Sequence, residues 1–206
     1  MNQKIVNSAI PYYVIKQRIL AINKPRDKLY FAVLYANGNR ASETLGLSLN
    51  DISFNEKFVF ATTLVLKKRG LAKGVLKRNP PISRVNEKWL TDIIIEYADI
   101  VKQMQVSSDE KVFPWGLRQS QRLAHKYFNC RIHLLRHARV THCLTILRMS
   151  LNQVIKYFEI SQREAVRWTM VYGHLNNKDL EEHLDILAIQ NKELQEVKDD
   201  VDVVGV

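Results

Sequence analysis

Hydrophobic residues recur at helical spacing through most of the chain. Between Leu29 and Ala36 they repeat three and four positions apart, and Asn37-Gly38-Asn39 follows with residues typical of a turn. We expect Asp27 to cap this helix. The same spacing predicts a short helix after Pro11, another that begins near Ala41, and helices over 86–101, 117–127, 133–147, 151–158, 162–171 and 180–197.

One segment has a different pattern. Residues 58–66 are rich in β-branched and aromatic side chains and contain neither Gly nor Pro, which predicts a strand. Residues 70–74 can turn the chain, and residues 75–82 can return as an antiparallel partner strand. The predicted fold class is therefore mainly α with a small antiparallel β hairpin or sheet at one edge.

The composition is that of an ordinary globular protein. The 206 residues are 46% hydrophobic and 25% charged, with 7 Gly and 5 Pro, which excludes collagen-like and low-complexity chains. No apolar stretch approaches the roughly 20 residues that span a membrane, and the polar start is unlike a signal peptide. Cys130 and Cys143 fit neither a metal motif nor a disulfide framework. We therefore expect a cytoplasmic protein with reduced cysteines and no membrane partner.

The charge is divided unevenly along the chain. Residues 1–175 hold 28 of the 31 Lys and Arg and 12 of the 21 Asp and Glu, so this body carries +16 and residues 176–206 carry −6. A basic body favours a polyanionic partner, and nucleic acid is the commonest one in a cell. A solvated basic surface without a partner is the alternative.

Four places in the body concentrate side chains that suit a phosphate. Arg40 stands between a turn and a helix, where a guanidinium and backbone N–H groups can converge on an anion. The other places are Lys73 in the hairpin, one helix face with His133, Arg136 and His137, and Tyr172 near the end of the body.

Together these groups supply the parts of a phosphoryl transfer. Such a reaction needs cations around the nonbridging oxygens, an acid for the leaving oxygen and a nucleophile. No carboxylate cluster accompanies them to hold magnesium, so we expect chemistry without a metal or another cofactor. A zinc site at His133 and His137, with Cys130 nearby, is the weaker hypothesis because Arg136 would add a cation beside the metal.

Two of these places carry longer motifs. Residues 34–47 read L-Y-A-N-G-N-R-A-S-E-T-L-G-L, and residues 133–142 read H-L-L-R-H-A-R-V-T-H. They resemble the boxes L-Y-x-T-G-x-R-x-S-E-L-x-x-L and H-x-L-R-H-x-x-x-T-H of the tyrosine recombinases, or phage-type integrases. Residues 72–82 resemble the family's G-K-G…R-x-x-P-L hairpin, and 112–115 look like a loop of archaeal-type integrases. The resemblance runs from about residue 28 to 175 and implies the tyrosine recombinase catalytic-domain type of fold.

The resemblance also implies a reaction, the cutting and rejoining of duplex DNA for integration or excision of a mobile element. Arg40 and Arg136 would hold the scissile phosphate, and Lys73 would protonate the leaving 5′ hydroxyl. His133 would assist proton transfer at the nucleophile. Tyr172 would attack and form a 3′-phosphotyrosyl link that conserves the energy of the broken bond, so no nucleotide cofactor is needed.

The chain departs from the family's pattern near the nucleophile. The family commonly has His or Trp nine residues before the tyrosine, whereas this chain has Arg163 there. We expect Arg163 to fill that hydrogen-bonding position, with Trp168 as the second candidate. The interval of 36 residues from Arg136 to Tyr172 is slightly long. Tyr157 is therefore a rival nucleophile, although its helix favours core packing.

We expect an N-terminal extension over 1–27, a catalytic domain over 28–175 and an acidic helix and tail over 176–206. The extension is too short for the DNA-clamping domain that the family usually carries, so we expect either that this domain was removed or that the protein is naturally short. An apolar stripe on 180–197 predicts a helix that packs on a neighbouring protomer, which implies a dimer to tetramer on double-stranded DNA. The basic residues expected to contact DNA are Lys67, Lys68, Arg69, Lys77, Arg78, Arg118, Arg122 and Arg139.

Two alternatives remain open at this point. A type IB topoisomerase or a telomere resolvase shares these residues but not necessarily a reaction between paired sites. A non-catalytic DNA-binding protein could keep the fold without turnover.

Overall fold

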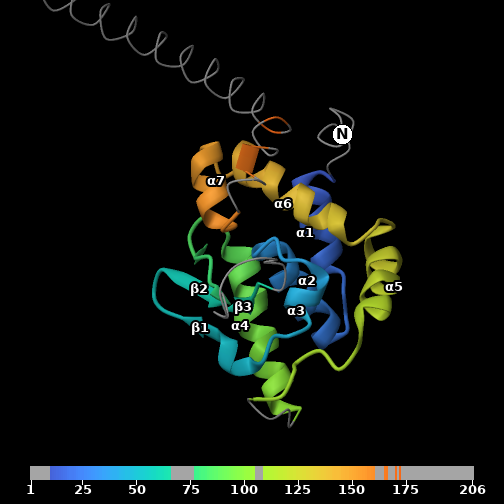
Figure 1. Cartoon of the computed structure of the whole chain (residues 1–206). Coiled ribbons are helices and arrows are strands. Elements are labelled where there is room, and N and C mark those ends of the chain that lie inside the picture. The colour runs from blue at the N-terminus through green and yellow to red at the C-terminus, as the bar shows by residue number, and fades with distance from the viewer. Residues whose placement is uncertain are drawn as a thin grey trace, which may run out of the picture.

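Helix α2 (Pro25–Ala36) lies at the centre of the fold. The computed structural model describes residues 10–65, 77–104, 109–160, 165–166, 170 and 172. Ten of the twelve residues of α2 are buried, as its nearly uninterrupted apolar sequence requires. It packs on α4 (Lys88–Gln103), α6 (His133–Thr145) and α1 (Tyr12–Leu20). Figure 1 shows these helices around it, with α6 at one end of the molecule.

Three further helices complete the described α elements, namely α3 (Ala41–Thr44), α5 (Leu117–Phe128) and α7 (Leu151–Tyr157). Asn129 ends α5 in the left-handed conformation at φ 48°. Ser150 caps α7 by accepting from the Gln153 backbone N–H at 3.2 Å. The helices predicted within these ranges are confirmed, with ends that differ by a few residues.

The expected cap of α2 is wrong. The helix begins at Pro25, a residue whose fixed φ suits the first position, so Lys24 stands at the cap and Asp27 lies inside the first turn. The carboxylate of Asp27 instead accepts a hydrogen bond from the Tyr127 hydroxyl at 2.7 Å. It thereby ties α2 to α5.

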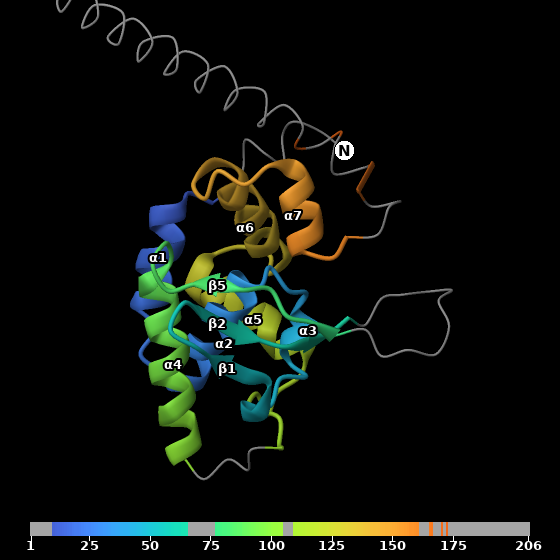
Figure 2. The same cartoon turned by 90° about the vertical axis from the view of Figure 1, so that its left-hand side faces the viewer.

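Within the described residues, the β structure consists of two small antiparallel sheets. A 3-10 turn (Leu49–Asp51) leads into β1 (Ile52–Phe54), which pairs with β2 (Phe58–Ala61), and β2 pairs with β5 (Ile82–Ser83). A second sheet joins β3 (Thr63–Leu64) to β4 (Lys77–Arg78). Figure 2 shows α4 beside the three-stranded sheet. The mainly α fold with a small antiparallel sheet is confirmed, and β1 is a strand that the sequence pattern did not indicate.

The buried hydrophobic side chains of the described residues form two clusters. The main core surrounds α2 and includes residues of α1, α4, α5 and the first half of α6. A smaller cluster lies between the second half of α6 and α7, and contains Val140, Leu144, Val154, Phe158 and Tyr172. The candidate nucleophile therefore belongs to the smaller cluster.

Helix α1 is part of the main core. Ile15, Ile19 and Ile22 are at most 1% exposed, and Arg18 Nη1 donates to the Tyr127 carbonyl at 3.4 Å. The boundary expected at residue 28 therefore does not separate α1 from the domain. No helix within the described ranges is both long and apolar enough to cross a membrane.

Candidate active site

Arg40 stands at the N-terminal cap position of α3, directly after the turn that ends α2. Its backbone N–H donates to Glu43 Oε2 at 2.8 Å, and its Nη1 donates to Glu43 Oε1 at 3.0 Å. The Glu43 side chain is fully buried, whereas that of Arg40 is 29% exposed. A carboxylate fixed in the interior thus holds a guanidinium that reaches the surface.

Arg136, on α6, is brought to the same turn. Its Nη1 donates to the Gly38 carbonyl at 2.5 Å, and its guanidinium carbon lies 5.7 Å from the centre of the Phe158 ring. Gly38 has φ +55°, and a Cβ on it would lie 2.2 Å from Phe158 Cε1. The turn therefore requires glycine on two grounds, the left-handed backbone and the close approach of the ring. Its carbonyl holds Arg136 at the turn that precedes Arg40, although the two arginines are far apart in the sequence.

Tyr172 lies beside α6 with its hydroxyl 2.7 Å from His137 Nδ1. The tyrosine is 2% exposed. Burial raises its pKa to about 12, while the nearby Arg136 acts in the opposite direction. Burial lowers the pKa of His137, and the neighbouring His133 and Arg136 lower it further. At neutral pH the pair is therefore a neutral phenol beside a neutral imidazole.

His133 lies one helical turn before His137, with the two ring centres 5.9 Å apart. His137, and not His133, is the histidine that contacts the Tyr172 hydroxyl. The helix face expected to carry Arg136 and both histidines is thus present on α6. The role of His137 beside the tyrosine was not predicted, although its i, i+4 spacing from His133 was visible in the sequence.

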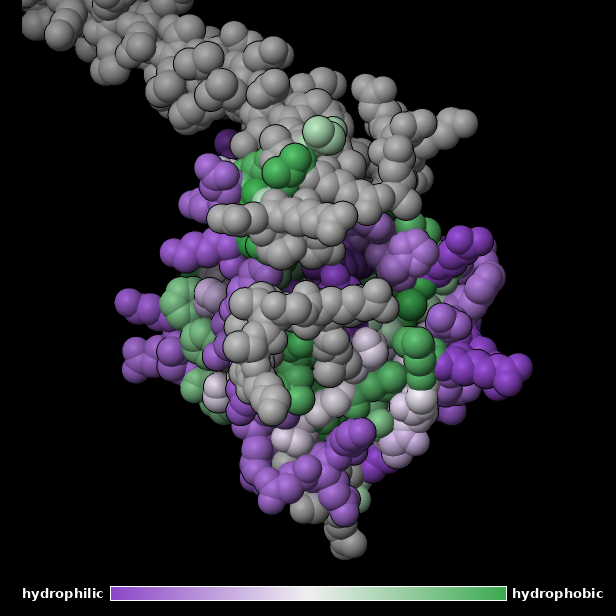
Figure 3. All heavy atoms as spheres, viewed as in Figure 1, coloured by the Kyte–Doolittle hydropathy of each residue, from purple (hydrophilic) through white to green (hydrophobic). Residues whose placement is uncertain are grey.

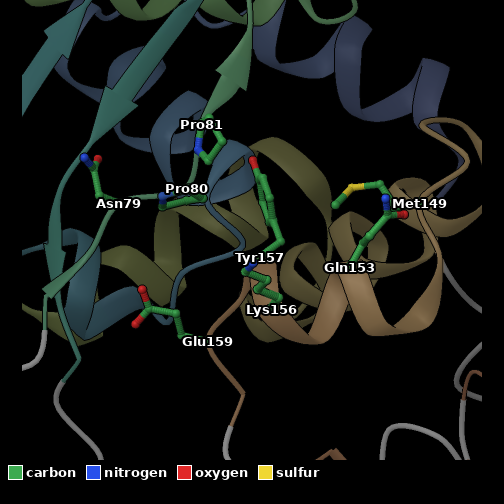
Figure 4. A pocket seen from close by; sticks show the side chains of 8 residues that line it. All are labelled: Asn79, Pro80, Pro81, Met149, Gln153, Lys156, Tyr157 and Glu159. Carbon is green, nitrogen blue, oxygen red and sulfur yellow. The ribbon is translucent and has the colours of Figure 1, made fainter.

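Tyr157, the rival nucleophile, has a different environment. Its hydroxyl accepts from Arg139 Nη2 at 3.3 Å, and burial raises its pKa. It also lines a cavity of about 290 Å³ between α7 and the segment Asn79–Pro81. Figure 4 shows the tyrosine directed toward Pro81. The lining of this cavity includes neither Arg40 nor Arg136.

Two of the arginines expected to contact DNA are buried, and for them that expectation is wrong. Arg139 is 0% exposed and forms an ion pair with Glu87, to which its Nη2 donates at 2.9 Å. Arg78 is 2% exposed and donates to Asn39, to Glu43 and to the Phe158 carbonyl. Because both guanidinium groups are engaged in the interior, neither can reach a phosphate in this structure.

The other predicted residues divide into two groups. Lys77, Arg118 and Arg122 are exposed. The last two lie on α5 among further polar side chains, and Figure 3 shows a hydrophilic surface over this helix. The second group consists of predicted residues that lie outside the described part, namely Lys67, Lys68, Arg69, Lys73, Arg163, Trp168 and the segment 176–206.

Glu43 was not among the predicted site residues, although the sequence contains a signal for it. It stands three positions after Arg40, the spacing of a capping box, and its backbone and side-chain contacts follow from that spacing. Within the described ranges, no group of three or more His, Cys, Asp or Glu side chains could hold a metal ion.

Comparisons with known proteins identify a family that this chain matches. Residues 14–178 match the Phage integrase family. The tyrosine recombinase XerD of Proteus mirabilis is 34% identical over 135 residues, which cover 58% of this chain and 39% of XerD. XerC of the same organism is 28% identical over 170 residues, 75% of this chain and 49% of XerC. The chain thus spans less than half the length of either relative.

Solved structures show the same fold. The XerH site-specific recombinase bound to palindromic difH substrate, in a post-cleavage complex, superposes with a TM-score of 0.57. Its sequence is 16% identical, and the match covers 91% of this chain and 53% of XerH. A pre-cleavage complex of XerH with difH gives a TM-score of 0.53 at 16% identity, over 82% of this chain and 49% of that one.

Proposed function

Because the chain belongs to the phage integrase family, we propose that it cuts and rejoins duplex DNA at specific sites through Tyr172. The observation that carries the proposal is the meeting of three groups. The Tyr172 hydroxyl lies 2.7 Å from His137 Nδ1, and Arg136 is close enough to lower the pKa of the phenol. A nucleophile, an imidazole and a guanidinium close together are what transfer of a phosphodiester requires.

In the proposed reaction the Tyr172 oxygen attacks the phosphorus and forms a 3′-phosphotyrosyl bond while the bond from phosphorus to the 5′ oxygen breaks. Arg40 and Arg136 neutralise the charge that builds on the nonbridging oxygens. Both lie at the turn around Gly38, which supports their joint action on one phosphate. Attack by a 5′ hydroxyl on the new link reverses the steps and rejoins the strand, so neither a metal nor a nucleotide cofactor enters the proposal.

Two protons move in this scheme. The phenol proton passes to a neutral imidazole, and His137 Nδ1 lies in position to accept it. His133, the residue that the family resemblance indicates, is the other candidate. Lys73 gives a proton to the leaving 5′ oxygen, and Arg163 occupies the position nine residues before the tyrosine; both roles rest on the sequence alone.

The DNA surface is proposed from charge and exposure. Arg118 and Arg122 stand one helical turn apart on the exposed face of α5, and Lys77 is exposed on β4. Such side chains can neutralise phosphates without reading sequence. The acidic segment 176–206 is proposed to pack on a neighbouring protomer on DNA, away from the phosphates that would repel it.

Covalent capture tests the reaction. The target sequence is unknown, so a pool of nicked duplexes with random sequence is incubated with the chain, and DNA that stays bound after denaturation is sequenced. Wild type and Tyr157→Phe should both retain DNA, and Tyr172→Phe should retain none because it lacks only the attacking oxygen. Attachment by Tyr172→Phe would refute the assignment. If the wild type binds DNA without covalent attachment, the protein is non-catalytic. If it relaxes plasmids that lack paired sites, it is a topoisomerase.

A further inference from the structure

The buried guanidinium of Arg78 touches three segments that carry the candidate site. Its Nη2 donates to Glu43 Oε2 at 3.1 Å and also to Asn39 Oδ1. Its Nη1 donates to the Phe158 carbonyl at 3.2 Å. Asn39 precedes Arg40, Glu43 holds Arg40, and Phe158 lies against Arg136.

The register of the second sheet fixes where this arginine lies. Arg78 on β4 is paired with Thr63 on β3, and Thr63 Oγ1 donates to the same Asn39 Oδ1 at 3.2 Å. On the adjoining strand, Asn37 Nδ2 donates to the Ala61 carbonyl at 2.5 Å. The turn before Arg40 is thus attached to both sheets through its two asparagines.

The charges around Glu43 give Arg78 an electrostatic role as well. The fully buried carboxylate has a cation on each side, Arg40 at 3.0 Å and Arg78 at 3.1 Å. Without Arg78, its repulsion of Arg40 would be lost, and the buried Glu43 carboxylate, left with Arg40 as its remaining ion-pair partner among the described residues, would draw the Arg40 guanidinium inward. A phosphate would then have to compete with a buried carboxylate for the same donors.

We propose that Arg78 is a positioning residue for the phosphate clamp, which acts through Glu43 and the 37–40 turn to keep the Arg40 guanidinium available to the scissile phosphate. The inference rests on the proposed function. Arg78 itself does not touch DNA in this role, because it is 2% exposed. It connects the clamp to the hairpin strand, five residues after Lys73 in the sequence.

A double-mutant cycle tests the proposal. Arg78→Met should slow single-turnover cleavage at saturating DNA by up to about 100-fold, the cost of a misplaced catalytic group. In an Arg40→Ala background the same substitution should cost less than about threefold, because the group that it misplaces is already gone. Arg78→Lys should recover part of the rate, since it keeps the charge without the fork of donors.

Arg139→Met is the matched control. Arg139 is equally buried and paired with a carboxylate, but it contacts neither Glu43 nor the turn. It should lower the melting temperature as Arg78→Met does, yet slow cleavage by the same factor in both backgrounds. Equal factors for Arg78→Met in the two backgrounds would overturn the proposal. The proposal would also be overturned if Arg78→Met changed only the DNA affinity and its salt dependence and left the cleavage rate unchanged.

A second measurement does not depend on cleavage. The Arg40 Nε–Hε resonance, identified by its loss in Arg40→Lys, should shift in Arg78→Met and stay in place in Arg139→Met. An unchanged Arg40 signal in Arg78→Met would refute the positioning role. If the wild type fails to cleave DNA, the proposed function fails, and the resonance still decides whether Arg78 positions Arg40.

Discussion

Replacing His137 by alanine should change how cleavage depends on pH as well as how fast it is. Burial raises the pKa of Tyr172 to about 12, about five units above neutral pH. At pH 7 only about one phenol in 100,000 is therefore ionised, which corresponds to about 7 kcal/mol at 1.36 kcal/mol per unit. The wild-type chain avoids this cost if His137 removes the proton during the proposed attack.

The pH profile of the wild type follows from the same pair. The pKa of His137 is lowered by burial and lies below its ordinary 6.5, so the imidazole is neutral and able to accept a proton throughout pH 7 to 9. The cleavage rate should therefore be nearly constant over that range. In His137→Ala the reactive form is the ionised phenol, so the rate should fall about 100-fold or more at pH 7 and rise about tenfold per pH unit.

Single-turnover formation of the covalent complex on a nicked substrate measures both quantities. His133→Ala is the matched control, because it removes the neighbouring imidazole, whose ring centre is 5.9 Å from that of His137. This variant should keep the flat profile. A flat profile and a near wild-type rate for His137→Ala would refute the reasoning, and loss of the flat profile in His133→Ala alone would assign the base to His133.

Three further outcomes are expected. Gly38→Ala should lower the free energy of unfolding in urea by about 3 kcal/mol, because the left-handed backbone and the 2.2 Å approach to Phe158 both oppose a Cβ; an unchanged midpoint would contradict this. Burial lowers the pKa of His142 to about 4, so the unfolded chain binds the extra proton first and about 3 kcal/mol of stability should be lost as the pH falls from 6.5 to 4. In denaturation experiments, His142→Gln should lose less stability over this pH range than the wild type, and His125→Gln should lose as much as the wild type. Equal losses in the two variants would count against the assignment to His142. Deleting residues 176–206 should weaken assembly on paired DNA sites, measured by native gels, more than binding to one half-site. Equal losses of assembly and of half-site binding would mean that the segment does not contribute to the pairing of sites.

The sequence was a good guide to the helices and a poorer one to the short elements. Helical spacing over ten or more residues averages many side chains, so α4, α5 and α6 could be placed to within a few residues. Strand β1 has only three residues, and Asn50-Asp51 before it indicates a loop. Its pairing with β2 is a tertiary contact that no local pattern records.

The candidate site shows the same limit in its charges. Local motifs identified Arg40 and Arg136, because the residues that surround each one are adjacent in sequence. The burial of Arg78 and Arg139 was not predictable, since their carboxylates lie 35 and 52 positions away. A count of basic residues treats a paired interior arginine and an exposed one alike.

The division of the hydrophobic side chains into two clusters places Tyr172 apart from the main core, which contains most of the buried apolar side chains. Tyr172 packs in the smaller cluster with Phe158 and α7. This cluster is joined to the main body partly by polar contacts, such as the hydrogen bond from Arg78 to the Phe158 carbonyl. Regions with few buried apolar contacts open at a lower free energy than the core of a domain. Amide hydrogens of α7 should therefore exchange with solvent before those of α2. The candidate nucleophile Tyr172 can then lose its packing contacts while the rest of the domain stays folded.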